Sequence, residues 1–219
     1  MPEVERPARR EREAPGRARP PAAEAVTTYA ELVREAAHCT RCDLYKAATR
    51  TVFGEGPTQA RFMLVGEIPG DMEDRRGRPF VGPAGRLLDR ALEQAGLDRS
   101  TVYLTNAVKH FKFEPKGRRR QHRAPSVPEI NACRYWLERE LALVDPRTIV
   151  TLGGTAARAV FGKPVRVLQA RGRFAALPSG RQAFVTIHPS AILRMPEDAL
   201  RQQAFETFVS ELRLLRENA

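Results

Sequence analysis

The hydrophobic pattern alternates between short continuous apolar runs and longer segments with apolar residues at helical spacing. Short apolar runs closed by glycine or polar residues predict buried strands. From 83 to 96, leucine and alanine recur every three or four positions, which predicts an amphipathic helix with Gly96 as its C-cap. We expect strands at 61–66, 101–106, 147–154 and 182–190, and further helices at 29–37, 126–144, 155–162 and 196–217.

Strands that alternate with helices indicate βαβ units, a mainly parallel sheet and helices on both of its faces. The length of 219 residues suits one such α/β domain. Residues 1–26 consist mostly of Pro, Arg, Ala and Glu with almost no large apolar groups, so we expect a disordered tail there. The predicted organisation is a tail over 1–26 and one domain over 27–219.

Polar side chains follow the predicted strands at their carboxyl ends. Glu67 follows the first strand, Asn106 closes the second, and His188 lies at the end of the fourth. In parallel sheets, ligands bind beyond the carboxyl ends of the strands, so we expect an acid, an amide and an imidazole in one pocket. A carboxylate there can activate water or stabilise a developing cation. A lone histidine such as His188 also fits a purely structural role.

The segment 66–86 is rich in Gly, Pro and charge and then opens a helix. It is not a Walker A loop, because no Gly-Lys-Ser or Gly-Lys-Thr sequence follows. Phe80 lies in this segment, where an aromatic ring can stack on a base, and Asp71 and Asp74 supply further carboxylates. The alternative is an ordinary turn-rich connection.

The distribution of charge along the chain indicates which class of partner the protein binds. The chain carries a formal net charge of +11 and has a sequence pI of about 10.4. The segment 109–123 holds seven Lys or Arg and one acidic residue, whereas residues 1–26 hold six Arg and five Glu. More than half of the net charge lies in this one patch, which favours a polyanionic partner such as nucleic acid. The alternative is the general basicity of a protein from a GC-rich genome.

One histidine, His122, lies within the basic segment. Neighbouring cations disfavour an imidazolium, so we expect a lowered pKa and a neutral ring at pH 7. A neutral imidazole can serve as a base or a nucleophile, and the alternative is a contact to phosphate or sugar. The surrounding cations are Lys116, Arg118, Arg119, Arg120 and Arg123.

The chain has three cysteines, and an odd, small number argues against a disulfide framework. Cys39 and Cys42 have the spacing of a metal-binding pair, and Cys133 supplies a third thiolate. The fourth ligand must be another residue type, and His110 is a better candidate than His38, which adjoins Cys39. This ligand number fits an iron–sulfur cluster or zinc. A redox Cys-x-x-Cys pair is the alternative, although that motif normally follows a strand.

No apolar run approaches the length of a membrane span, and no secretory signal is visible. We therefore expect no membrane association and a cytoplasmic location. The small number of cysteines agrees with a reducing compartment.

Six motifs follow one another between about residues 29 and 215. They are CTRC (39–42), GEIPGDMEDRRGRPFVGPAGRLLD (66–89), YLTNAVKHFKF (103–113), RRRQH (118–122), AC (132–133) and HPSAILR (188–194). Together they resemble the iron–sulfur class of uracil-DNA glycosylases, most closely the UdgX type, which is related to the family 4 enzymes. The resemblance implies a three-layer α/β/α sandwich around a four-stranded parallel sheet, and a structural [4Fe–4S] cluster.

The resemblance also implies roles for individual residues. Glu67 would act near the sugar, and His110 would ligate the cluster where family 4 enzymes carry a fourth cysteine. The implied cluster ligands are Cys39, Cys42, His110 and Cys133. The implied substrate-binding residues are Ile68, Gly70, Asp71, Phe80 (which would stack on uracil), Asn106 (which would read it), His188 and Arg194. The residues implied to support the loop or bind DNA are Asp74, Lys116, Arg118, Arg119, Arg120, Arg123 and Ser190.

In the UdgX type, a histidine at the position of His122 attacks C1′ of the sugar, and the enzyme stays bonded to the abasic site. The resemblance thus implies that His122 and Glu67 are catalytic in a monomer that acts on uracil-containing DNA, preferably single-stranded, and releases free uracil. Two positions depart from the type, which commonly has Gln at Ile68 and Ile at Gln121. The alternatives are a conventional glycosylase that releases an abasic site and a non-catalytic iron–sulfur protein that binds nucleic acid.

Overall fold

The computed structural model of the chain describes residues 28–218, so the predicted tail lies outside the described residues. Its sheet consists of β1 (Phe62–Gly66), β2 (Tyr103–Asn106), β5 (Thr148–Leu152), β6 (Arg173–Ala176) and β7 (Gln182–Thr186), in the order β2-β1-β5-β7-β6. Four strands run parallel, as predicted, and β6 pairs antiparallel with β7. The sequence did not predict β6, because its few apolar residues give too short a pattern to distinguish from a loop.

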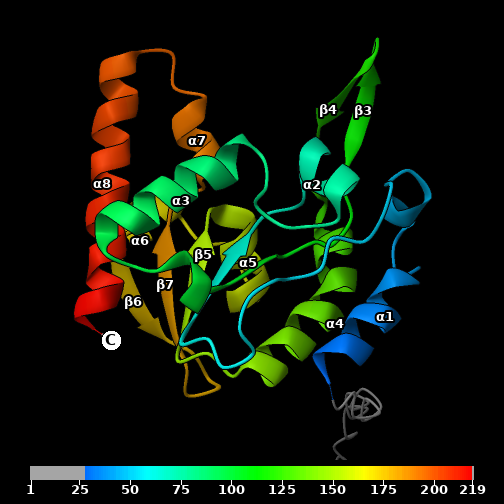
Figure 1. Ribbon diagram of the computed structural model, residues 1–219, viewed down its shortest axis with the longest axis horizontal. Coiled ribbons are helices and arrows are strands. Elements are labelled where there is room, and N and C mark those ends of the chain that lie inside the picture. The colour runs from blue at the N-terminus through cyan, green and yellow to red at the C-terminus, as the bar shows by residue number, and fades with distance from the viewer. Residues whose placement is uncertain (1–27, 219) are drawn as a thin grey trace, which may run out of the picture.

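Helices cover both faces of the sheet and complete three layers (Figure 1). They are α1 (Tyr29–Ala37), α2 (Asp71–Arg76), α3 (Pro83–Ala95), α4 (Val127–Val144), α5 (Gly154–Phe161), α6 (Val167–Ala170), α7 (Pro189–Leu193) and α8 (Asp198–Glu217), with 3-10 turns at Asp43–Lys46 and Arg99–Thr101. Successive residues of β1 point to opposite faces of the sheet. Leu64 packs in the hydrophobic core on the side of α3 and α8, and Met63 packs in the core on the side of α1 and α4. The α/β fold class is confirmed.

Local sequence signals begin α4 and end α3 where they were predicted. The Ser126 side chain accepts the Glu129 N–H, and the Glu129 carboxylate accepts the Ser126 N–H at 2.6 Å. Gly96 ends α3 with a φ of 72°. Among the described residues, no helix is long and apolar enough to cross a bilayer.

The basic segment, for which the sequence predicted neither a strand nor a helix, forms a β-hairpin. Strands β3 (Phe113–Lys116) and β4 (Arg119–His122) pair antiparallel, with Phe113 opposite His122. Gly117 takes a φ of 59° in the tight turn, a conformation that suits glycine. The hairpin projects from the molecule next to α2 (Figure 1). Apart from Phe113 and Pro115, every residue of the two strands is polar or charged, so no apolar alternation marks them, and proline disfavours a strand.

Lys109 and Glu140 form an ion pair in which both side chains are fully buried. Glu140 on α4 also accepts the hydroxyls of Tyr103 (3.1 Å) and Thr105 (2.9 Å). The Lys109 ammonium also donates to the Thr105 hydroxyl (2.6 Å) and the Asn106 carbonyl (2.7 Å). Lys109 therefore ties the end of β2 to α4 and is not part of the basic surface to which the sequence analysis assigned it.

Replacing Glu140 by Gln is expected to lower the free energy of unfolding by about 3–5 kcal/mol, because the buried Lys109 ammonium then has no carboxylate partner. Glu138→Gln breaks an exposed pair with Arg134 on the same helix and should cost less than about 1 kcal/mol. Urea unfolding followed by circular dichroism measures both variants. Equal losses in the two variants would contradict the importance of the buried pair.

Candidate active site

A cavity of about 650 Å³ opens at the carboxyl edge of the parallel strands. Its walls come from the segments that follow β1 and β7, from the last residue of β2 and from the end of the β3–β4 hairpin. The cavity thus brings together the side chains that were expected at three strand ends. The predicted residues that line it are Glu67, Ile68, Gly70, Asp71, Phe80, Asn106, His122, His188, Ser190 and Arg194.

Asn106 and Phe80 approach each other across Gly66, the last residue of β1. A side-chain carbon at Gly66 would lie 2.3 Å from Asn106 Oδ1 and 2.7 Å from Phe80 Cζ, so glycine leaves room for both groups. Phe80 takes a φ of 57°, in the left-handed region, and its ring stacks on His188 with centroids 6.3 Å apart. Backbone strain of this kind costs about 1–3 kcal/mol and clusters at functional sites.

The hydrogen bonds around His188 fix its tautomer. The Ser190 N–H donates to His188 Nδ1 at 3.1 Å, so this nitrogen is unprotonated and the proton lies on Nε2. Ser190 Oγ lies 2.7 Å from the same nitrogen and accepts a hydrogen bond from Arg194 at 3.0 Å. Burial, followed by the charges of Arg194 and His122, lowers the pKa of His188 to about 4. The ring is therefore neutral at pH 7 and carries a donor at Nε2.

Glu67 is held by Thr155, whose hydroxyl donates to Glu67 Oε1 at 2.6 Å. A smaller cavity of about 260 Å³ is lined by both residues, so the Glu67 carboxylate lies at two adjoining cavities. A carboxylate in this position can orient a water molecule or stabilise a developing positive charge. Thr155 was not predicted from the sequence, although a hydroxyl residue directly after Gly153 and Gly154 was an available signal.

His122 closes β4 and lines the same cavity while keeping access to solvent. Partial burial at the cavity lowers the pKa of His122, the Glu67 carboxylate opposes that shift, and Arg194 adds to it. The predicted direction is confirmed, but the causes are burial and Arg194 rather than the cations of the hairpin. A neutral imidazole has the free lone pair that a nucleophile or base requires.

Arg120 ties the hairpin to α2. It donates from Nε to Asp71 Oδ1 at 2.5 Å and from Nη1 to Asp74 Oδ2 at 2.6 Å, and the Asp74 side chain is fully buried. Its guanidinium carbon also lies 5.2 Å from the ring centre of Phe111 and 5.0 Å from that of Phe113. Arg120 is thus an anchor for the hairpin rather than a cation available to phosphate.

The other cations of the hairpin fall into two groups. Arg123 pairs with Glu114 on the facing strand. Lys116, Arg118 and Arg119 are exposed at the hairpin tip. The tip cations are therefore the ones that can contact phosphates.

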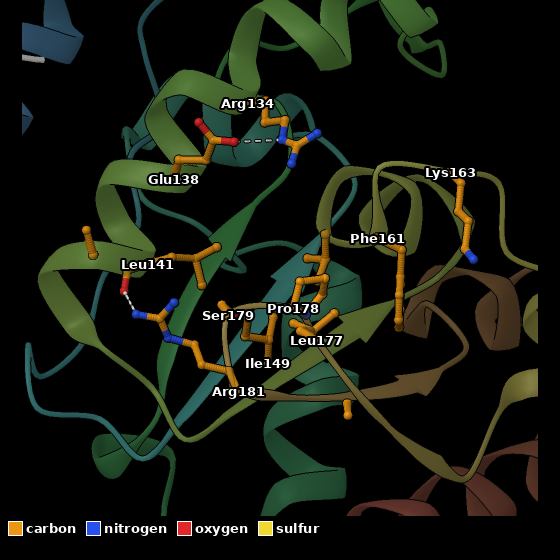
Figure 2. A pocket seen from close by; sticks show the side chains of 13 residues that line it. Arg134, Glu138, Leu141, Ile149, Phe161, Lys163, Leu177, Pro178, Ser179 and Arg181 are labelled. Carbon is orange, nitrogen blue, oxygen red and sulfur yellow. Dashed lines mark hydrogen bonds and ion pairs between the residues drawn. The ribbon is translucent and has the colours of Figure 1, made fainter. Parts of the chain in front are cut away.

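A separate cavity of about 570 Å³ lies between α4, α5 and the turn that joins β6 to β7 (Figure 2). An ion pair between Arg134 and Glu138 (2.8 Å) flanks it, and Arg181 donates to the Leu141 carbonyl at 3.4 Å. None of the predicted site residues lines this cavity. The cavity at the carboxyl edge is therefore the candidate active site.

Comparison with known proteins assigns the family. The family model described as the uracil DNA glycosylase superfamily matches residues 53–213. The chain belongs to this superfamily. It is 38% identical over 169 residues to the type-4 uracil-DNA glycosylase of Thermotoga maritima, across 77% of this chain and 84% of that protein. The type-4 enzyme of Archaeoglobus fulgidus is 36% identical over 174 residues (76% and 84%), and the type-5 enzyme of Thermus thermophilus is 33% identical over 184 residues (75% and 80%).

The three cysteines lie on the side of this glycosylase-family domain where α1 and α4 pack. Burial raises the pKa of Cys133 to about 12; the ammonium and the N–H of Lys109 oppose this shift, and Cys42 and Cys39 add to it. Trp136 donates to Cys39 Sγ at 3.0 Å, and the Lys109 N–H donates to Cys133 Sγ at 3.2 Å. Among residues 28–218, no three His, Cys, Asp or Glu side chains form a metal-holding group.

His110, the fourth predicted ligand, is buried, and burial lowers its pKa. The Thr51 hydroxyl donates to the Ala36 carbonyl at 2.9 Å, and its oxygen lies 2.8 Å from His110 Nε2, so Nε2 carries the proton. Nδ1 is then unprotonated, as metal ligation by an imidazole requires. The donor chemistry of the four residues therefore fits a thiolate–imidazole centre, although the side chains are not gathered into one.

Replacing Arg120 by Met should release the hairpin from α2, because buried Asp74 then has no cationic partner. The amides of β4 should exchange with deuterium roughly tenfold faster or more, since the free energy of local opening falls. Arg119→Met, at the exposed neighbouring position, is the matched control and should exchange like the wild type. Equal protection of the hairpin in Arg120→Met and the wild type would contradict the anchor.

Proposed function

We propose that the chain is a uracil-DNA glycosylase that excises uracil and then becomes bonded to the abasic site through His122. The observation that carries the proposal is the placement of Glu67, Phe80, Asn106, His122 and His188 around one cavity. The names of the type-4 and type-5 relatives, uracil-DNA glycosylases, support the same substrate. The covalent step rests on the position of His122 and on its lowered pKa.

The target base must leave the helical stack, or lie in single-stranded DNA, before it can enter the cavity. Phe80 offers its ring for stacking, and Asn106 offers an amide that can both donate and accept. The cations at the hairpin tip bind the flanking phosphates. We expect single strands to be preferred, because they require no unpairing energy.

The bond between C1′ and N1 of uracil breaks, and its electron pair leaves on the base. His188 donates from Nε2 to a uracil carbonyl oxygen, whose negative charge grows as the bond breaks. The Glu67 carboxylate, held by Thr155, stabilises the positive charge that develops on the sugar. Uracil departs as an anion and takes a proton from solvent.

The neutral ring of His122 then donates its lone pair to C1′ and forms a nitrogen–carbon bond. The ring becomes cationic and loses its N–H proton to Glu67 or to solvent, which leaves a neutral alkylated imidazole. A nucleophile held beside C1′ outcompetes water through its effective concentration. Each protein molecule therefore reacts once.

A conventional glycosylase that releases a free abasic site is the second candidate. The smaller cavity beside Glu67 favours it, because a water molecule placed there could attack C1′ in place of His122. Gln121 lines the larger cavity next to His122, and the Ile68 side chain joins the core that contains the cysteines. These two departures from the UdgX type can change how His122 is aimed and leave excision intact.

We further propose a [4Fe–4S] cluster held by Cys39, Cys42, His110 and Cys133, with zinc as the alternative metal. When bound, the cluster supplies a tie between the segments that carry these residues, and no step of the reaction uses it. The free thiols and the unprotonated Nδ1 of His110 support this ligand set.

Two further expectations concern the state of the protein in the cell. We propose that it acts as a monomer, because one chain supplies every wall of the cavity. We propose a cytoplasmic site of action, where thiols stay reduced and available to a cluster.

The wild-type protein should shift a single-stranded oligonucleotide with one uracil to a slower band on a denaturing gel. In His122→Ala, the shifted band should fall below about 1% of the wild-type amount, because the nucleophile is gone. The control is His38→Ala, because His38 does not line the cavity. This variant should form the shifted band in the wild-type amount.

The same gel distinguishes the alternatives. Strand cleavage after alkali without any shifted band would replace covalent capture by the conventional glycosylase. Intact DNA in both assays would leave a non-catalytic protein that binds nucleic acid.

The purified protein should contain about four iron atoms and four acid-labile sulfides per chain and absorb broadly in visible light. His110→Ala should lose most of this iron, because it removes one of the four ligands, whereas His38→Ala should retain it. Elemental analysis measures both variants. Zinc in place of iron would overturn the cluster assignment, and equal iron in both variants would exclude His110 as a ligand.

A further inference from the structure

Glu73, the third residue of α2, lines the cavity and has none of the roles assigned above. Its carboxylate accepts the N–H of Gly70, the residue that caps α2. Burial raises the pKa of this carboxylate, and the nearby backbone N–H groups of Gly82 and Phe80, in the segment that leads into α3, oppose the rise. One carboxylate therefore joins two walls of the cavity.

Phe80 is the residue in this arrangement that needs support. Its backbone lies in the left-handed region, and such strain persists only where the surroundings fix it. On the carbonyl side, Gly85 packs so closely that a side-chain carbon there would lie 1.6 Å from the Phe80 oxygen. On the amide side, the N–H faces the Glu73 carboxylate closely enough to oppose the rise in its pKa. The backbone of Phe80 is thus held from both directions.

The contacts of Glu73 differ from those of an ordinary helix-capping glutamate such as Glu31 in α1. In α1, Glu31 occupies the same third position and bonds with the N–H and the hydroxyl of its own cap residue, Thr28. The cap of α2 is Gly70, which has no hydroxyl. A side-chain carbon at Gly70 would lie 2.6 Å from Oε2 of Glu73, and one at Gly82 would lie 3.5 Å from Oε1. The two oxygens therefore face two different segments.

We propose that Glu73 is a positioning residue that fixes the Phe80 ring for stacking on uracil by holding Gly70, Phe80 and Gly82 together. The inference rests on the proposed glycosylase function and adds a residue that acts through Phe80. A carboxylate suits three N–H donors because both of its oxygens only accept. Glutamine would turn an NH₂ donor toward at least one of these N–H groups.

Glu73→Gln and Glu31→Gln form a matched pair, since each alters a third-position carboxylate of a helix and only Glu73 lines the cavity. The inhibition constant of free uracil is measured together with the single-turnover rate of uracil release from single-stranded DNA. Free uracil makes no DNA contacts, so its inhibition constant reports the position of Phe80. This constant should rise about tenfold or more in Glu73→Gln and stay unchanged in Glu31→Gln.

Deuterium exchange at the Phe80 and Gly82 amides is measured on the same proteins and should accelerate only in the Glu73 variants. Glu73→Asp keeps two acceptor oxygens on a shorter side chain, gives an intermediate inhibition constant, and substitutes for the Gln variant if that variant does not fold. Unchanged inhibition and exchange would overturn the role of Glu73 alone. Absence of uracil release by both the wild type and Glu31→Gln would instead refute the proposed function.

Discussion

The ion pairs between Arg120 and the two aspartates of α2 are the interaction on which the site depends. The hairpin has exposed cations at its tip. The contact between Arg120 and α2 determines the position of the opposite end, which carries His122. Asp74 is buried, so salt screens its pairing with Arg120 much less than it screens an exposed pair. If the hairpin moved away from α2, the buried Asp74 carboxylate would lose the cation that compensates its charge. The free-energy cost of this loss favours one position of the hairpin. In that position His122 lines the cavity, and α2 places Glu73 on the same cavity wall.

Two histidines share the cavity, and their hydrogen bonds give them different chemistry. His188 accepts the Ser190 N–H at Nδ1 and therefore carries a donor at Nε2, which suits a leaving group that gains negative charge. His122 has a lowered pKa and an available lone pair, which suits attack on an electrophilic carbon. Burial lowers the pKa of both rings, and the charge of Arg194 adds to the shift in each.

The sequence predicted the features that depend on local pattern and missed those that depend on distant partners. Helix capping at Ser126 and the parallel strands follow from nearby residues, and Glu67 lies at the cavity because parallel strands share a carboxyl edge. Lys109 looked like a surface cation, but Glu140, 31 residues later, pairs with it in the core. Thr155 meets Glu67 from 88 residues away, and a single sequence carries no signal for that contact beyond a hydroxyl after two glycines.

Mass spectrometry of the reacted protein tests most directly whether the His122 ring reaches C1′. The wild-type protein is incubated with a single-stranded oligonucleotide that contains one uracil, and the products are digested with nuclease and protease. Fragmentation of the modified peptide should place the deoxyribose remnant on His122, with an equal amount of free uracil released. A remnant on another residue, or uracil release without any modified peptide, would contradict the account.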